Sequence, residues 1–272
     1  MSGVILAVVQ HPDAARAILL AADQAARLMR AARVNVLAIR TPAIAMVPVS
    51  EGMLSFAEED PTCALEATRL ATLQRGFTAW AAARPVGAPA AEWVELDGWA
   101  EQLVDEWGER ADLIVIGRPA ATPSEPERRA LHAALFDTNR PVLVVPPGHA
   151  AGFGARVAIA WRDDARTTQA VLAALRWLGG AEIHVLTGAR AWSAPPALPP
   201  IFAEHGITAQ LHVLPVASGR GFGEALLARA HEIGADAVVL GAFAHPMLRG
   251  LILGGVTKYM LSQADLPVLM RH

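Results

Sequence analysis

The sequence predicts two α/β domains in tandem, each built on a parallel sheet covered by helices on both faces. The first observation is that apolar segments of strand length alternate with helical patterns along all 272 residues. The second is an internal repeat, which three pairs of segments carry in the same order: VILAV at 4–8 with VAIAW at 157–161, ADLIVIG at 111–117 with ADAVVLG at 235–241, and NRPVLVV at 139–145 with DLPVLMR at 265–271. The third is a Pro- and Gly-containing linker over residues 146–154. We therefore expect domains at residues 1–148 and 155–272.

Each half reads as strands alternating with helices. In the first half, buried apolar runs predict strands at residues 4–9, 34–39, 92–96, 112–116 and 141–145. Amphipathic patterns predict helices at 12–30, 61–83, 98–110 and 125–136, with Pro12 suited to a first helical turn. Residues 40–60 break the pattern and predict a long irregular crossover.

The second half repeats this order. Strands are expected at residues 157–161, 182–186, 208–214, 237–240 and 267–270. Helices are expected at 165–178, 201–204, 223–233 and 256–263. The stretch between Gly241 and Gly254 is predicted to be a loop.

Composition excludes several classes of function. A formal net charge of −3 gives no basic surplus for binding a nucleic-acid backbone, so nucleic acid is not an expected partner. The lone cysteine, Cys63, excludes a disulfide framework. No targeting segment is legible, and no apolar run approaches the ~18 residues of a membrane span, which predicts a cytoplasmic protein that does not contact membranes.

The last forty residues carry the clearest candidate site. A buried strand ends at Gly241, the pair Gly254-Gly255 follows, and a helix begins at Val256. Glycines let a ligand approach the backbone, and the first amides of a helix have no internal partner and point at an anion. The segment therefore predicts a phosphate site.

These residues resemble the universal stress protein family in its tandem two-domain form. The family signature, Gly-x2-Gly-x9-Gly-Ser/Thr, corresponds here to Gly241, Ala244 and Gly254-Gly255. The segments ALFDTNRPVLVVPPG at 134–148, RVAIAWRDDARTTQAV at 156–171 and VTKYMLSQADLPVLM at 256–270 are also typical of the family. The resemblance implies Rossmann-like domains of the adenine nucleotide alpha hydrolase type, each with five parallel strands, and a dimer.

The resemblance also implies a ligand, which is ATP or another adenine nucleotide such as AMP, with Mg²⁺ only where ATP is bound. The base is expected near Trp161, Asp163, Asp164, Leu186 and Thr187, and the phosphates over Gly241, Ala244, Gly254, Gly255 and Val256. Arg162 stands where ATP-binding relatives carry an aspartate. In the first domain Arg128-Arg129 replace the glycine pair, as either a solvated basic turn or a contact for an anion.

Several alternatives stay open. Trp161 is either a core aromatic or a plane on which a base stacks. Gly219-x-Gly221-x-Gly223 is a helix start rather than a dinucleotide loop, and His184, His205 and His212 lack metal-ligand spacing. No catalytic residue is legible. We expect a non-catalytic stress-response protein whose two domains pair within the chain and which forms a homodimer. The alternatives are an interaction module without nucleotide and a slow ATP hydrolase.

Overall fold

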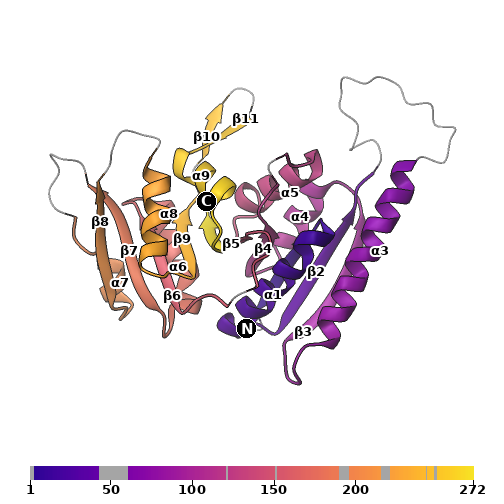
Figure 1. Ribbon diagram of the computed structural model, residues 1–272, viewed down its shortest axis with the longest axis horizontal. Coiled ribbons are helices and arrows are strands. Elements are labelled where there is room, and N and C mark those ends of the chain that lie inside the picture. The colour runs from indigo at the N-terminus through magenta and orange to yellow at the C-terminus, as the bar shows by residue number, and fades with distance from the viewer. Residues whose placement is uncertain are drawn as a thin grey trace. The chain divides into compact units, whose positions relative to one another are not determined.

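The chain divides into two packed units. The computed structural model describes residues 3–42, 61–120, 122–150, 152–189, 196–215, 221–242, 244–247 and 250–272. Internal contacts separate Met1–Arg140 from Pro141–His272, and Figure 1 shows the elements of each. This division precedes the strand that the sequence analysis placed at the end of the first domain. The bounds 1–148 and 155–272 follow the repeat and stay a prediction.

Unit 1 is built on four parallel strands. They lie in the order β3-β2-β1-β4. Their bounds are β1 (Val4–Val9), β2 (Arg33–Arg40), β3 (Ala90–Asp97) and β4 (Leu113–Gly117). The central strands are apolar through their length and buried on both faces, as parallel strands between helical layers must be.

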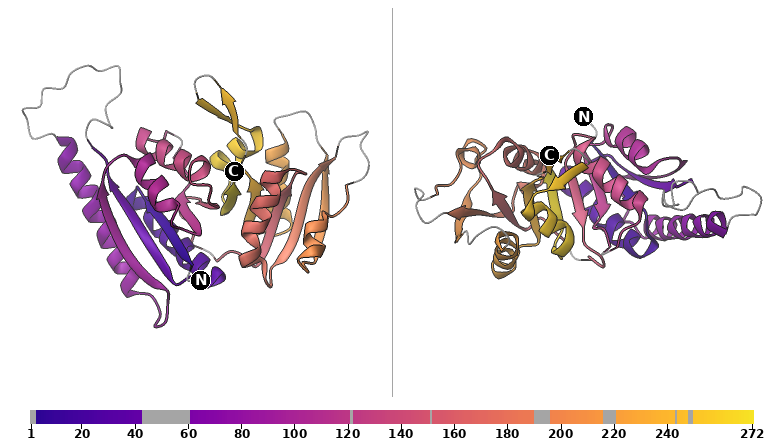
Figure 2. Two further views of the ribbon diagram at one scale, coloured as in Figure 1. Left: turned by 180° about the vertical axis from the view of Figure 1, so that it is seen from behind. Right: turned by 90° about the horizontal axis from the view of Figure 1, so that it is seen from above.

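The helices of unit 1 pack as two pairs. Their bounds are α1 (Pro12–Met29), α3 (Pro61–Ala82), α4 (Ala100–Gly108) and α5 (Glu125–Phe136). Helix α1 packs on α3, and α4 packs on α5. From β1 to β3 the chain adds strands toward one edge of the sheet, and it then crosses to the other side of β1 to form β4. Because parallel crossovers are right-handed, this change places the two helix pairs on opposite faces of the sheet (Figure 2).

Unit 2 contains the five predicted parallel strands and one more. The strands are β5 (Val142–Val145), β6 (Arg156–Trp161), β7 (Glu182–Ala189), β8 (Ala209–Pro215), β9 (Ala237–Gly241) and β12 (Val268–Arg271). Their order is β5-β12-β9-β6-β7-β8. Strand β5, expected as a parallel strand of the first domain, pairs antiparallel with β12. The prediction of an α/β fold with a parallel sheet between helices is confirmed.

The helices of unit 2 also cover both faces of their sheet. Their bounds are α6 (Ala165–Leu178), α7 (Pro200–Glu204), α8 (Phe222–Glu232) and α9 (Gly255–Gln263). Helix α6 packs on β9 and β12, and α8 packs on α9. Figure 2 shows α8 and α9 on the face opposite α6.

One element was not predicted. A hairpin of β10 (Ala244–Met247) and β11 (Gly250–Leu253) stands between β9 and α9, where the sequence analysis expected a loop. Residues 43–60 of the predicted irregular crossover, and Gly219, lie outside the described residues.

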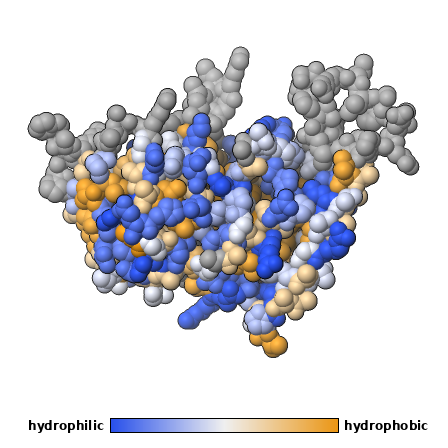
Figure 3. Space-filling view, viewed as in Figure 1, coloured by the Kyte–Doolittle hydropathy of each residue, from blue (hydrophilic) through white to orange (hydrophobic). Residues whose placement is uncertain are grey.

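The surface mixes polar and apolar side chains. In the view of Figure 3, hydrophobic residues are interspersed with charged ones. Two of the most exposed large apolar side chains, Leu65 and Val86, lie near the two ends of α3. Within the described segments, no helix combines the length and apolar character that a bilayer crossing requires.

Candidate functional site

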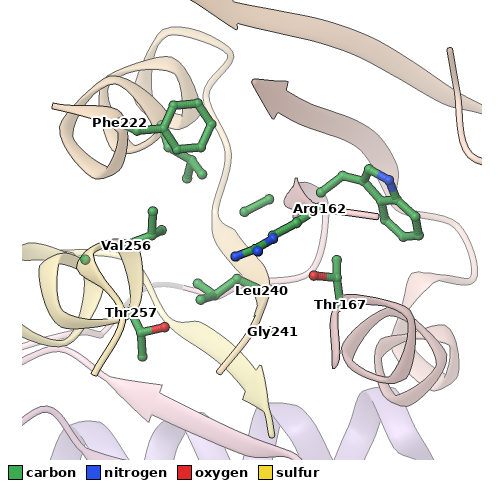
Figure 4. A pocket seen from close by; sticks show the side chains of 12 residues that line it. Arg162, Thr167, Phe222, Leu240, Gly241, Val256 and Thr257 are labelled. Atoms are coloured by element: carbon green, nitrogen blue, oxygen red, sulfur yellow. The ribbon is translucent and has the colours of Figure 1, made fainter. Parts of the chain in front are cut away.

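A cavity of about 210 Å³ lies in unit 2, at the point in the sheet where the order of strand addition changes from one edge to the other. Strands β6 and β9 are parallel neighbours, and the chain continues from them toward opposite edges of the sheet. In open α/β sheets ligands bind beyond the carboxyl ends of the strands at this switch point. The ends of β6 and β9 and the first turns of α6, α8 and α9 contribute the lining residues (Figure 4).

The structure brings five of the predicted site residues together. Trp161, Gly241, Gly254, Gly255 and Val256 all line the cavity. Phe222, Leu226 and Leu240 add apolar wall that the sequence analysis did not nominate.

The N-terminus of α9 opens toward this cavity. Gly254 is the N-cap residue, and within the described part of the chain no side chain caps the helix. The first intrahelical bond runs from the Lys258 amide to the Gly254 carbonyl, at 2.9 Å. A Cβ at Gly255 would meet no atom within 4 Å, so the backbone there borders open space. The amides of Gly255 and Val256, which have no intrahelical acceptor, and the positive end of the helix dipole therefore face the cavity, where an anion could bind.

A buried hydroxyl from α6 faces the same space. Asp164 is the N-cap of α6, and its Oδ1 accepts from the Thr167 amide at 2.9 Å. The Thr167 side chain lines the cavity and is 1% exposed. Its Oγ1 has no hydrogen-bond partner among the described residues, and Figure 4 shows it directed toward the cavity. The sequence analysis missed Thr167. The pattern Asp-x-x-Thr at a helix start is the signal that places it there.

The charged residues after β6 separate into two roles. Arg162 lines the cavity, and its largely exposed side chain extends toward the middle of it in Figure 4. Its Nε lies 3.3 Å from Asp164 Oδ2. Asp163 is exposed and is not among the lining residues. Asp164, nominated as a base contact, instead caps α6 and pairs with Arg162.

The predicted base contacts on β7 are packed differently. Leu186 is fully buried, Thr187 is 9% exposed, and neither lines the cavity. Trp161, which pairs with Thr187 across the strands, packs edge-on against Phe202 with ring centroids 6.0 Å apart. Trp161 thus has a packing contact as well as a place in the cavity wall. Ala244 is the first residue of β10.

The equivalent position in unit 1 is closed by the protein itself. Helix α5 carries a capping box, in which Ser124 accepts from the Glu127 amide and Glu127 accepts from the Ser124 amide. Gln10, after β1, donates to the Pro126 carbonyl at 3.4 Å, and His11 lies 3.1 Å from Glu127. Burial opposes the ionisation of Glu127, but these bonds from Ser124 and the nearby His11 lower its pKa.

Arg128 and Arg129 lie within α5 and not in a glycine-like loop. Both are largely exposed, and both pair with Glu125. Arg129 also lies 3.0 Å from Glu101 of α4. This arrangement matches a solvated basic surface, one of the two interpretations drawn from the sequence.

A second polar cluster lies outside the cavity. The rings of His184 on β7 and His212 on β8 meet, with Nδ1 and Nε2 2.9 Å apart, although their sequence spacing indicated no metal site. Arg229 of α8 contacts His212 Nδ1 at 3.0 Å, and Glu182 contacts His184 Nε2 at 3.0 Å. Burial, then the charges of Arg229 and His184, lower the pKa of His212. Within the described ranges, no group of three or more His, Cys, Asp or Glu side chains is placed to hold a metal ion.

Comparison with known proteins identifies a family match in the last part of the chain. Residues 216–272, which include β9 and α9, match the model of the universal stress protein family. A comparison with curated protein sequences gives no match.

Solved structures of similar fold cover the full length. A universal stress protein from Archaeoglobus fulgidus DSM 4304 has a TM-score of 0.70 and 15% sequence identity, over 100% of this chain and 96% of that one. A putative universal stress protein from Pseudomonas aeruginosa UCBPP-PA14 has a TM-score of 0.58 and 16% identity, over 98% and 92% of the two chains. The resemblance seen in the sequence is therefore supported in two ways: the segment 216–272 matches the model of the universal stress protein family, and the fold of the whole chain is that of solved universal stress proteins.

Proposed function

We propose that this chain is a non-catalytic stress-response protein whose unit 2 binds an adenine nucleotide weakly. The phosphates occupy the space over Gly254, Gly255 and the Val256 amide. The base extends toward Trp161 and the segment of Asp163. The observation that carries the proposal is the uncapped N-terminus of α9 at the cavity, where a Cβ on Gly255 would enter open space.

The dimensions of the cavity favour weak binding. Sites that enclose a drug-sized ligand measure ~300–1,000 Å³, whereas this cavity measures about 210 Å³. A nucleotide therefore extends beyond it and leaves part of its surface in water. Among the described residues, the lining includes no carboxylate and no histidine, the side chains that most often act as general bases, which favours binding over hydrolysis.

Calorimetric titration with ATP tests the site. Gly255→Glu places a carboxylate at the first turn of α9, where it suits the helix dipole but repels phosphate. Gly255→Gln is the matched control of nearly equal size. We expect the glutamate variant to lose the ATP heat and the glutamine variant to retain more of it. An unchanged heat in Gly255→Glu would refute the assignment of the phosphate site.

The proposal includes the homodimer that the family resemblance implies. Sedimentation at micromolar concentration measures it directly, and a purely monomeric species would remove the dimer from the proposal without touching the nucleotide site.

A further inference from the structure

We propose that the cavity of unit 2 recognises the phosphate chain of its ligand and is nearly indifferent to the base. The contacts are the Thr167 hydroxyl and the Arg162 guanidinium, acting with the amides of Gly255 and Val256 at the start of α9. The inference rests on the proposed nucleotide site and adds which part of the ligand supplies the affinity.

The first argument is the state of Thr167. Helical threonines commonly donate to the carbonyl four residues earlier, and in this chain Thr168 does so to Asp164 at 3.1 Å, as Thr68 and Thr78 do to Ala64 and Gln74. Thr167, next to Thr168, makes no such bond within the described part of the chain and is 1% exposed. Buried polar groups without a partner are rare and costly. A phosphate oxygen in the cavity supplies the acceptor that this hydroxyl lacks.

The second argument is charge. Arg162 is the only ionisable side chain among the residues described as lining the cavity, and its guanidinium extends toward the centre (Figure 4). The start of α9 adds the positive end of a helix dipole. Both lie on a wall that is otherwise apolar, and Asp164, 3.3 Å from Arg162 Nε, offsets part of the guanidinium charge. A guanidinium and backbone amides together match the geometry of phosphate oxygens.

The third argument is that the lining residues lack the groups needed to distinguish one base from another. Discrimination among bases requires donors and acceptors matched to the base edge, and a carboxylate or amide side chain commonly supplies them. The described lining has neither. Leu186 and Thr187, the expected base contacts, are buried away from the cavity.

The fourth argument is size. A cavity of about 210 Å³ is too small for a whole nucleoside triphosphate. The positive wall and Thr167 line the cavity itself, so the phosphates occupy it and the base remains at the mouth.

Ligand competition tests the inference. We expect ATP, GTP and CTP to bind the full-length protein with dissociation constants within about threefold of one another, and AMP to bind at least roughly tenfold more weakly, since it offers fewer charge-assisted bonds. Inorganic tripolyphosphate should displace ATP, and adenosine should not. Adenosine that binds as tightly as ATP, or tripolyphosphate that fails to compete, would overturn the inference and leave the proposed function standing. Absence of binding by every ligand would refute both.

Variants of the two neighbouring threonines separate contact from folding. Thr167→Val keeps the side-chain shape and removes the unpartnered hydroxyl, so we expect the melting temperature to hold or rise while ATP affinity falls about fivefold to tenfold. Thr168→Val removes an existing bond to Asp164 and should lower the melting temperature slightly with unchanged affinity. Unchanged ATP affinity in Thr167→Val, or a clearly lower melting temperature in that variant, contradicts the role assigned to the hydroxyl.

Discussion

The ion pair between Asp23 and Arg84 gives a stability prediction for unit 1. Arg84, just beyond α3, reaches back to α1 and donates from Nη2 and Nε to Asp23 Oδ1, at 2.9 and 3.1 Å. Both side chains are only 9% exposed. The second oxygen of Asp23 pairs with Arg27, whose side chain is 51% exposed. The guanidinium of Arg84 also lies 4.6 Å from the ring centre of Trp80.

The perturbation is Arg84→Met, which keeps an apolar stem over Trp80 and removes the charge. Breaking a buried pair by removing one partner costs ~3–5 kcal/mol, because the other charge stays buried. Since Arg27 still compensates Asp23 in part, we expect a loss of about 2–3 kcal/mol in the free energy of unfolding. Removing both charges with Asp23→Leu and Arg84→Met should recover part of that loss.

Urea unfolding followed by tryptophan fluorescence measures the effect, because Trp80 lies beside the pair. The matched control is Arg110→Met, which breaks an exposed pair with Glu106 whose side chains are 63% and 55% exposed. Such pairs contribute at most ~0.5 kcal/mol. Equal losses in the free energy of unfolding for Arg84→Met and Arg110→Met would contradict this prediction, as would a double variant, Asp23→Leu with Arg84→Met, that is less stable than Arg84→Met alone. Either result would show that burial of the ion pair does not determine the free-energy cost of breaking it.

Three further predictions concern pH, a helix cap and a glycine. Because the pKa of His212 is lowered below its ordinary 6.5, the unfolded chain binds more protons, and the stability of unit 2 should fall as pH drops below 6.5. The slope is at most ~1.4 kcal/mol per pH unit for this proton, and His212→Gln should reduce it in urea midpoints measured from pH 5 to 7.5. Ser124→Ala, which removes the cap of α5, should cost about 1 kcal/mol in the same assay, and no change would disprove the capping box. Gly108→Ala would place a Cβ 2.5 Å from Thr138 Cγ2 and should cost ~1–3 kcal/mol, whereas Gly76→Ala, with no atom within 4 Å, should be neutral or stabilising.

Strand positions could be read from the sequence because buried parallel strands leave a strong signal. The run LIVIG of β4 and the run AVVLG of β9 are apolar at every position and end at glycine. The hairpin of β10 and β11 leaves no such signal. Each strand has four residues, and Pro246 within β10 indicates a turn when it is read without its partner.

The partner of β5 could not be predicted for a different reason. The residues VLVV are buried on both faces, so the period of the side chains says nothing about direction. The repeat gave β5 the role that β12 has in unit 2, and the antiparallel pairing of β5 with β12 is an additional contact about which the repeat says nothing. Chain direction in a sheet is a property of packing and is not encoded in one four-residue segment.

Some residues of the candidate site could likewise be identified from the sequence, and others could not. Gly254 and Gly255 are visible in the sequence because glycines before a helix are an uncommon pattern with a specific use. For Thr167, the pattern Asp-x-x-Thr gives its place at the start of α6 but not the role of its hydroxyl, since a threonine near a helix start ordinarily bonds to its own backbone. Asp164 was assigned to the ligand because it lies two residues after Arg162, the position at which ATP-binding members of the family carry an aspartate. Its position at the start of α6 makes it a cap instead.

Comparing the helix that begins at this place in each unit shows which of its features the fold itself requires. Each has a helix that begins beside a switch point, and each helix needs acceptors for its first amides. In unit 1, Ser124 and Glu127 supply them, and Gln10 and His11 hold that turn from β1. In unit 2, Gly254 is the N-cap of α9, and no capping side chain is found among the described residues. Because the same topology is closed by side chains in one unit, the open end in the other is not a requirement of the fold, and this difference is the reason for proposing an anion from solution as its acceptor.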